Sequence, residues 1–151
     1  MQATWGWTQR QIVRQRSAYP KNVDLPVSVK AALRCGERWV LLRNERNEWE
    51  LPGGRIDPDD QSLPDVVVRE CREEIGIEVT VGVLLGSWLF EVVPDKRVVI
   101  ICFSAEADPE SELVISHEHN AVGMFEIDEL AELNLPYGYR QAIRQAATQP
   151  N

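Results

Sequence analysis

Three glutamates occur at helical spacing in one short stretch of the chain, residues 69–77 (RECREEIGI). At about 100° per residue, Glu70, Glu73 and Glu74 fall within about 100° of arc on one side of a helix. Like charges three and four residues apart repel each other and destabilise an isolated helix. A hard divalent cation would offset this repulsion, and magnesium beside a phosphate is the common case. The competing interpretation is a solvated acidic face.

The surrounding sequence favours a helix from about residue 63 to residue 75. Ser62 can cap its start, Pro64 suits its first turn and Gly76 suits its exit. An apolar stripe lies beside the acidic one and consists of Val67, Val68, Cys71 and Ile75. One face of this helix is therefore expected to pack on a core, while the neighbouring face presents carboxylates to a cleft.

The segment 49–56 (WELPGGRI) precedes this helix and is separated from it by a loop rich in Asp and Pro. Together the two segments resemble the signature of the Nudix hydrolase family, G-x5-E-x7-R-E-U-x-E-E-x-G-U, where U is a bulky aliphatic residue. The matching residues are Gly54, Arg69, Glu70, Glu73, Glu74, Gly76 and Ile77, with Cys71 at the first U position. The direct match spans residues 49–77. The pattern of strands around it extends the resemblance, more weakly, to most of the chain.

One position departs from the signature. Counting back from Arg69 places Gln61 where the family has Glu, whereas counting forward from Gly54 places Asp60 there. The loop between them therefore carries one extra residue. In the family this Glu is mostly a structural partner of the motif arginine, so its role here is either lost or moved to Asp60 or Asp59. Activity is still expected, because the three glutamates of the helix are unaffected.

The resemblance implies hydrolysis of a phosphoanhydride bond in a nucleoside diphosphate linked to a further group X. ADP-ribose, nucleotide sugars and nucleoside triphosphates all remain open as substrates. The resemblance also implies that Glu70, Glu73 and Glu74 bind Mg²⁺, with Mn²⁺ as the alternative. Such a metal lowers the pKa of a bound water. Arg69 is expected to orient the motif by ion pairing, and with Glu73 it is assigned to the catalytic residues.

A general base is also needed. The segment 116–120 (SHEHN) occupies the place from which many family members supply it. Glu118 is predicted to be this base or an additional metal ligand, with Glu112 as the fallback. His117 and His119 are interpreted as ordinary surface residues rather than as groups that tune this carboxylate.

Four residues are predicted to contact the substrate. Gly53 and Gly54 permit close backbone approach before the helix, and Arg55 and Arg43 are candidates for phosphate contacts. Three aromatic residues are candidates for stacking on a base, although aromatic residues in strands are more often part of a core. These are Trp49, Trp88 and Phe90.

The remaining pattern predicts an α/β (α+β) fold, a Nudix-like α/β/α sandwich around a mixed β-sheet. Strands are expected at 27–33, 39–43, 49–51, 78–90, 97–105 and 122–126, and further helices at 127–133 and 137–147. Gly82 and Gly86 are expected to mark a bulge or bend in the strand 78–90. Cys35 is placed in a turn, whereas Cys71 and Cys102 are placed in the core.

Composition narrows the class of protein. The chain of 151 residues predicts one domain, 1–151, with residues 1–22 as an N-terminal extension. The net charge of −8 argues against a nucleic-acid polymer as partner but allows a small-molecule nucleotide. The absence of a long apolar run or a secretory leader, together with three cysteines without ligand spacing, predicts a cytoplasmic protein without membrane association. Trp5 and Trp7, in a short helix expected over 3–17, would anchor this segment either on the body of the protein or on a second subunit, and the second alternative would make a homodimer.

Two other functions stay open at this level. One is a non-catalytic Nudix module that senses a nucleotide without cleaving it, and the persistence of all three glutamates argues against it. The other is an acidic domain that binds divalent ions or a protein partner. The spacing from the Gly-Gly pair to the Arg-Glu pair argues against that interpretation.

Overall fold

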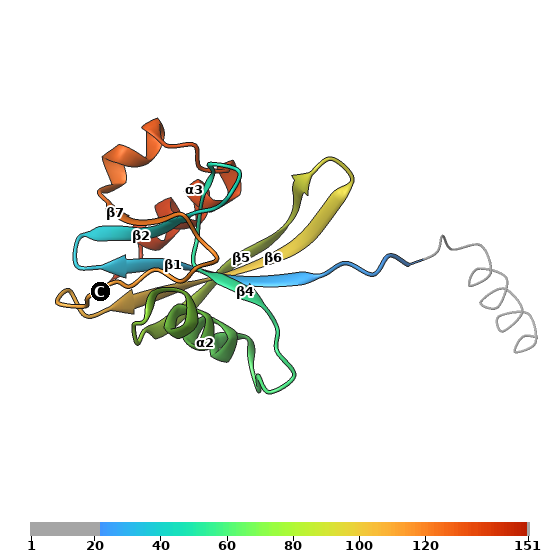
Figure 1. Ribbon diagram of the computed structural model, residues 1–151, viewed down its shortest axis with the longest axis horizontal. Helices are drawn as coiled ribbons and strands as arrows, with labels where there is room; N and C mark the ends of the chain where they lie inside the picture. The colour runs from blue at the N-terminus through green and yellow to red at the C-terminus, as the bar shows by residue number, and fades with distance from the viewer. Residues whose placement is uncertain (1–21, 151) are drawn as a thin grey trace, which may run out of the picture.

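The computed structural model describes residues 22–150, and a mixed sheet of seven strands forms the centre of this part. Helix α2 (Leu63–Ile75) covers one face of the sheet, and helix α3 (Tyr137–Ala147) covers the other (Figure 1). The strands are β1 (Val27–Cys35), β2 (Arg38–Arg43), β3 (Trp49–Glu50), β4 (Gly53–Arg55), β5 (Thr80–Val93), β6 (Lys96–Ala107) and β7 (Ala121–Phe125). The predicted α/β/α sandwich is confirmed.

Strand β1 organises the sheet. It runs parallel to β6 along its whole length, with Val29 opposite Ile101, and pairs antiparallel with β2 at its end. Its first half also pairs antiparallel with β4, so that Lys30 lies opposite Gly53. The order β3-β2-β1-β6-β5 leaves β5 at one edge, while β7 pairs with β2. The segment that carries the two motif glycines is thus a short strand beside the centre of the sheet, which is not among the strands expected from the sequence.

Alternation along β1 divides the core into two clusters. Val29, Ala31 and Leu33 point toward α2, where they pack with Val67 and Ile75. The opposite face packs against α3 and against the 3₁₀ helix η1 (Ile127–Glu132), which replaces the predicted helix 127–133. Helix α3 buries Ala142, Ile143 and Ala146, as its sequence predicts.

The ends of α2 confirm the predicted caps. The Ser62 hydroxyl accepts a hydrogen bond from the Asp65 N–H at 3.3 Å, which satisfies one of the free donors of the first turn. Gly76 ends the helix with a φ of 70°, in the left-handed region that glycine enters without steric cost. These caps fix where the acidic turn lies relative to β4.

Two further predictions concern the strands. Register shifts around Leu84 and Gly86 confirm the predicted irregularity of β5. The placement of Cys35 in a turn is wrong, because this residue ends β1, is buried, and its thiol donates to the Asp108 carbonyl at 3.3 Å. The predicted helix over 3–17, with Trp5 and Trp7, lies outside the described residues. Across residues 22–150, no helix is long and apolar enough to cross a bilayer.

Candidate active site

Glu74 is buried between α2 and β4. Its exposed fraction is 3%, and its Oε1 accepts a hydrogen bond from the Gly53 N–H at 2.7 Å. Gly53 has a φ of 136°, and a Cβ there would collide with the Val29 carbonyl oxygen, so only glycine brings this N–H so close. Burial raises the pKa of Glu74 to about 7, although the charge of Lys30 and the Gly53 hydrogen bond oppose this shift.

Glu70 lies against the second motif glycine. A Cβ on Gly54 would lie 2.6 Å from Glu70 Oε1, closer than any real Cβ contact. Burial raises the pKa of Glu70 even though the Arg69 guanidinium opposes the shift. The predicted close approach at both glycines is therefore confirmed, and its result is that β4 sits directly against two of the three glutamates.

Arg69 lies on α2 and connects Asp60, in the loop before the helix, to two of the helix glutamates through hydrogen bonds. Its Nε and Nη2 donate to the two carboxylate oxygens of Asp60 at 3.0 and 2.9 Å, a bidentate pair. Its Nη1 donates to Glu70 Oε1 at 3.0 Å and to Glu73 Oε2 at 3.2 Å. The pKa of Asp60 is lowered by the hydrogen bonds from Arg69. The acidic role that the sequence left open therefore belongs to Asp60, while Gln61 is exposed.

Asp60→Asn is expected to lower turnover by roughly 10- to 100-fold, because groups that orient metal ligands typically contribute this much. Without the Asp60 carboxylate, Arg69 is free to move away from Glu70 and Glu73. Asp59→Asn is the matched control, since the Asp59 side chain lies on the same loop and is exposed. Steady-state kinetics of both variants check this expectation, and equal rates in the two would contradict it.

The three glutamates have the donor chemistry that Mg²⁺ prefers, since all supply carboxylate oxygens from one helix. In the arrangement shown, however, Glu70 and Glu73 share Arg69 Nη1, and Glu74 is bound to Gly53. No group of three or more His, Cys, Asp or Glu side chains in the described part of the chain is placed to hold a metal ion. The Glu73 side chain is 59% exposed, so it can reorient at little cost. The carboxylate chemistry therefore suits a hard cation, whereas in the arrangement shown the three side chains are held by Arg69 and Gly53.

A second group of charged side chains, which the sequence did not reveal, consists of Lys30, Glu50 and His119. Lys30 is 7% exposed and donates from Nζ to the Gly53 carbonyl at 3.2 Å. The Glu50 carboxylate forms two hydrogen bonds. Its Oε1 lies 2.8 Å from His119 Nε2, and its Oε2 accepts from Asn44 Nδ2 at 3.3 Å. Burial alone would raise the pKa of Glu50, but the His119 hydrogen bond, the charge of Lys30 and the Asn44 hydrogen bond lower it to about 2. The one feature of the sequence that could have indicated this group is Lys30, which lies among apolar residues in β1.

The interpretation of His119 as a surface residue is wrong. Its side chain is 8% exposed, and its Nε2 lies 3.6 Å from Glu74 Oε2. The hydrogen bond with Glu50 raises the pKa of His119. His117, Glu118 and Glu112 are exposed, so His119 is the residue of this segment that reaches the glutamates. The role of Glu118 as a base stays a prediction.

The two arginines and the three aromatic residues predicted to contact the substrate lie in different surroundings. Arg43 lies over the Trp49 ring, with its guanidinium carbon 5.7 Å from the ring centroid, and Trp49 packs edge-on against Phe125. Arg55 is exposed, and its carbonyl accepts a hydrogen bond from Arg69 at 2.9 Å. Trp88 and Phe90 both pack on Tyr139, at 5.9 and 5.6 Å between centroids. Trp49, Trp88 and Phe90 therefore pack on the core, which agrees with the second of the two interpretations given for them. The exposed side chain of Arg55 is accessible to a ligand.

The metal-free protein is expected to lose stability as the pH rises from about 5 to 8. Burial raises the pKa of Glu74 from 4.5 to about 7, so between these values the folded state holds a proton that the unfolded chain releases. Unfolding is therefore favoured as the pH rises, by on the order of 3 kcal/mol in total. The raised pKa of His119 acts in the same direction.

Urea unfolding at several pH values checks this expectation. Glu74→Gln, which has no ionisable group, should remove most of the slope. A free energy of unfolding that rises over this range in the unsubstituted protein would contradict the assignment.

Comparison with known proteins decides the family. The NUDIX domain family model matches residues 24–146, which is most of the chain. The chain belongs to the NUDIX family.

Relatives agree with this assignment. A CTP pyrophosphohydrolase of Escherichia coli (strain K12) is 50% identical over 44 residues, which are 29% of this chain and 32% of that protein. The chain thus matches only about a third of the length of that curated relative. The crystal structure of the MutT protein from Methanosarcina mazei Go1 is 28% identical, with a TM-score of 0.69 over 83% of this chain and 96% of that one. A MutT NUDIX hydrolase from Burkholderia pseudomallei is 27% identical, with a TM-score of 0.69 over 82% and 98%. The predicted family and fold are confirmed.

Proposed function

We propose that this NUDIX protein is a Mg²⁺-dependent pyrophosphohydrolase. Its substrate would be a nucleoside diphosphate linked to a further group X, including a nucleoside triphosphate. The observation that carries the proposal is the contact of β4 with α2, in which Gly53 and Gly54 bring the backbone directly against Glu74 and Glu70. A simple acidic surface has no need of two glycines at these positions.

The side chains of this chain would divide the work. Glu70, Glu73 and Glu74 would bind Mg²⁺, or Mn²⁺ in its place. The bound ion would offset charge on the diphosphate and lower the pKa of a water molecule. Arg69 holds Glu70 and Glu73 in one orientation, and Lys30 balances the buried carboxylates of Glu50 and Glu74. Glu118 is the proposed general base, and the exposed Arg55 a proposed phosphate contact.

The substrate class follows from charge and from one relative. The net charge of −8 disfavours a polyanion, whereas a small nucleotide can be neutralised locally by a metal. The named activity of the Escherichia coli relative makes CTP the first compound to test. A cytoplasmic location stays a prediction. A homodimer stays a prediction as well, because Trp5 and Trp7, on which it depends, lie outside the described residues.

The test is a hydrolysis screen of the full-length protein. CTP, other nucleoside triphosphates, ADP-ribose, nucleotide sugars and dinucleotides are each incubated with Mg²⁺, with Mn²⁺ and with EDTA. We expect phosphoanhydride cleavage of at least one compound that needs the metal. Nucleotide binding without turnover of any compound would replace the hydrolase by the sensing module. Cleavage that persists in EDTA would refute the metal assignment.

A further inference from the structure

A groove runs along the outer edge of the sheet between β5 and α3. Its volume is about 530 Å³, and residues 85–90 of β5 form one wall. Tyr137, Gln141 and Gln145 of α3 are part of the other wall, and none of the described residues that line the groove is charged. Tyr137 is 73% exposed and Leu89 is 57% exposed, so the groove presents apolar surface to its surroundings. It lies on the α3 side of the sheet, whereas α2 with its glutamates covers the opposite face (Figure 1).

The groove also borders an edge strand. In the described structure β5 pairs only with β6, which leaves the backbone groups on its other side open to a further strand or segment. Proteins normally cover or blunt such an edge. The apolar side chains and the free edge together mark a surface that another segment of chain can cover.

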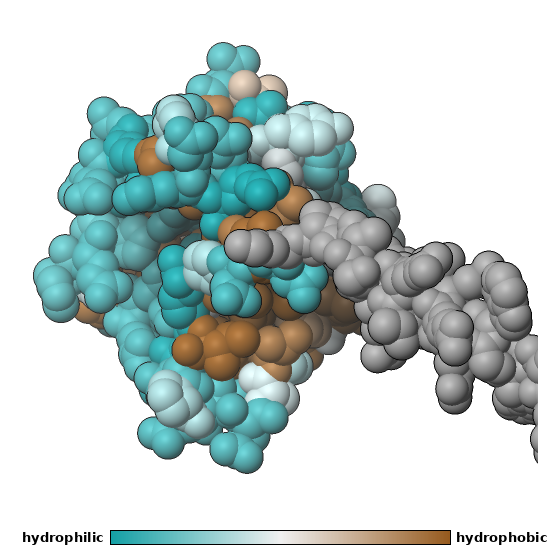
Figure 2. Space-filling model, turned by 90° about the vertical axis from the view of Figure 1, so that its right-hand side faces the viewer, coloured by the Kyte–Doolittle hydropathy of each residue, from teal (hydrophilic) through white to brown (hydrophobic). Residues whose placement is uncertain are grey.

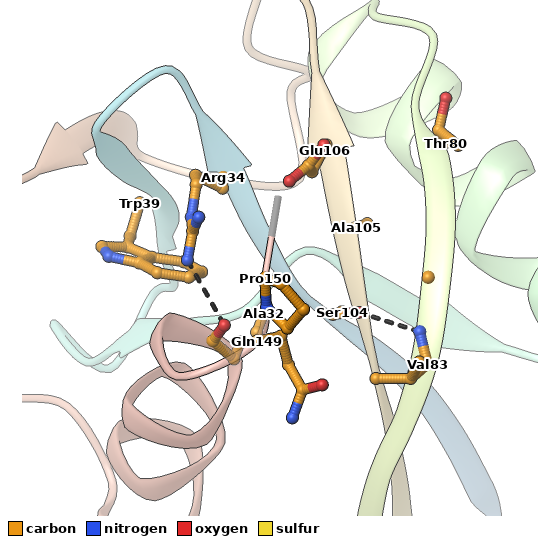
Figure 3. Close-up of a pocket in the computed structure, with 12 residues that line it drawn as sticks. Ala32, Arg34, Trp39, Thr80, Val83, Ser104, Ala105, Glu106, Gln149 and Pro150 are labelled. Atoms are coloured by element: carbon orange, nitrogen blue, oxygen red, sulfur yellow. Dashed lines mark hydrogen bonds between the residues drawn. The ribbon is translucent and has the colours of Figure 1, made fainter.

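A second cavity, at the other end of α3, is less suited to an apolar occupant. Its volume is about 280 Å³, and Arg34 and Glu106 line it (Figure 3). Arg34 donates to the Ala146 carbonyl at 3.3 Å, and the Ser104 hydroxyl accepts from the Val83 N–H at 2.9 Å. Its walls are charged, and these polar groups already have partners. The uncharged groove along β5 is therefore the better site for an aromatic side chain.

The first 21 residues of the chain combine large apolar side chains, which suit the groove, with a basic charge, which suits the acidic body of the protein. They contain Trp5 and Trp7, four Lys or Arg residues, and no Asp or Glu. The rest of the chain contains the other 12 Lys and Arg residues and all 24 Asp and Glu residues. A basic segment is attracted to such an acidic body. Tryptophan offers the largest apolar area for burial in a groove.

The described chain that follows this segment begins close to the groove. The Pro26 carbonyl accepts a hydrogen bond from the Val99 N–H at 2.9 Å, and Val99 pairs with Leu89 of β5. Two strand spacings, about 10 Å, therefore separate Pro26 from the wall of the groove. The stretch of sequence from Trp7 to Pro26 is long enough to span this distance several times over when extended, so the groove lies within reach of both tryptophans. Figure 2 shows hydrophobic side chains gathered on the end of the molecule where the described chain begins.

We propose that residues 1–21 dock in the groove between β5 and α3 of their own protomer, with a tryptophan side chain between Trp88 and Tyr137. The segment then covers the open edge of β5 and the exposed ring of Tyr137. The proposal concerns a face separate from the glutamates and stands whether or not the protein is a hydrolase.

Hydrogen exchange on the full-length protein is the first test. Trp5→Ala/Trp7→Ala should speed the exchange of amides in residues 85–90 and in the first turns of α3 by roughly ten-fold, because the docked segment no longer protects them. Amides of α2 should be unaffected. Gln9→Ala/Gln11→Ala is the matched control within the same segment and should behave like the unsubstituted protein. Unchanged exchange at residues 85–90 in the tryptophan variant would overturn the proposal.

Cross-linking tests which copy supplies the segment. Gln9→Cys, which leaves both tryptophans in place, combined with Gln145→Cys should form a disulfide within one chain on mild oxidation, detected as a monomer of altered mobility. The three native cysteines are buried and should not interfere. Gln9→Cys with Glu37→Cys, in the exposed turn after β1, is the control. Cross-linked dimers alone would overturn docking within one protomer and assign the groove to a second copy. Cross-linking no faster than the control would overturn docking altogether.

Discussion

Glu74→Gln is expected to lower Mg²⁺-dependent hydrolysis by about 10²-fold or more, the scale of losing a positioned catalytic group. The substitution removes the negative charge that a cation would require but keeps the shape of the side chain. The amide oxygen can still accept the Gly53 N–H, which Glu74 Oε1 now receives at 2.7 Å. The fold should therefore survive, and the loss should appear in kcat and in Mg²⁺ affinity measured by titration calorimetry.

Stability separates this effect from simple unfolding. A neutral amide avoids the burial of a carboxylate, so the Tm of Glu74→Gln at pH 8 should match or exceed that of the unsubstituted protein. Glu110→Gln, in an exposed loop, is the matched control and should leave both rate and Tm unchanged. Hydrolysis by Glu74→Gln at the original rate would refute the assignment of this carboxylate to the metal.

Lys30→Met is expected to destabilise the protein by about 3 kcal/mol, which corresponds to a fall in Tm of roughly 6–12 °C for a chain of this size. The Lys30 ammonium is buried beside Glu50 and Glu74, and removing it leaves carboxylates without their counter-charge. Although burial lowers the pKa of Lys30, its electrostatic interactions with Tyr139, Glu50 and Glu74 raise it overall, so the ammonium is charged in the folded protein. Differential scanning calorimetry measures the change. Lys96→Met, on the exposed β5–β6 hairpin, is the control.

A double-mutant cycle identifies the partner. If Lys30 and Glu50 act as a pair, Lys30→Met/Glu50→Gln should be more stable than the sum of the single effects by at least about 1 kcal/mol. Strict additivity would show that Lys30 does not stabilise the protein through Glu50.

Local patterns predicted the elements of the site well, because they depend on neighbours within a turn or two. Ser62, Pro64 and Gly76 define where α2 begins and ends, and helical spacing places the three glutamates on one side. The strand positions follow from alternation, which is why β1, β2, β6 and β7 agree with their predictions to within about two residues.

Contacts between distant segments were decided by the tertiary structure alone. Glu50 and His119 are 69 residues apart, and nothing in the sequence near either residue indicates that they meet. The partner of Arg69 was likewise undecided, because Gln61, Asp60 and Asp59 are all close enough in sequence. The path of the loop turned Asp60 toward the guanidinium.

The sequence by itself thus determined the family signature, the acidic helix and its caps, since these are properties of neighbouring residues. The tertiary structure decided that β4 lies against Glu74 and Glu70, and that a buried lysine and histidine accompany them. The physical reason is burial. A glutamate in water has a pKa of 4.5, whereas the pKa of the buried Glu74 is raised to about 7. This burial results from the packing of α2 on β4, which the sequence near Glu74 does not determine.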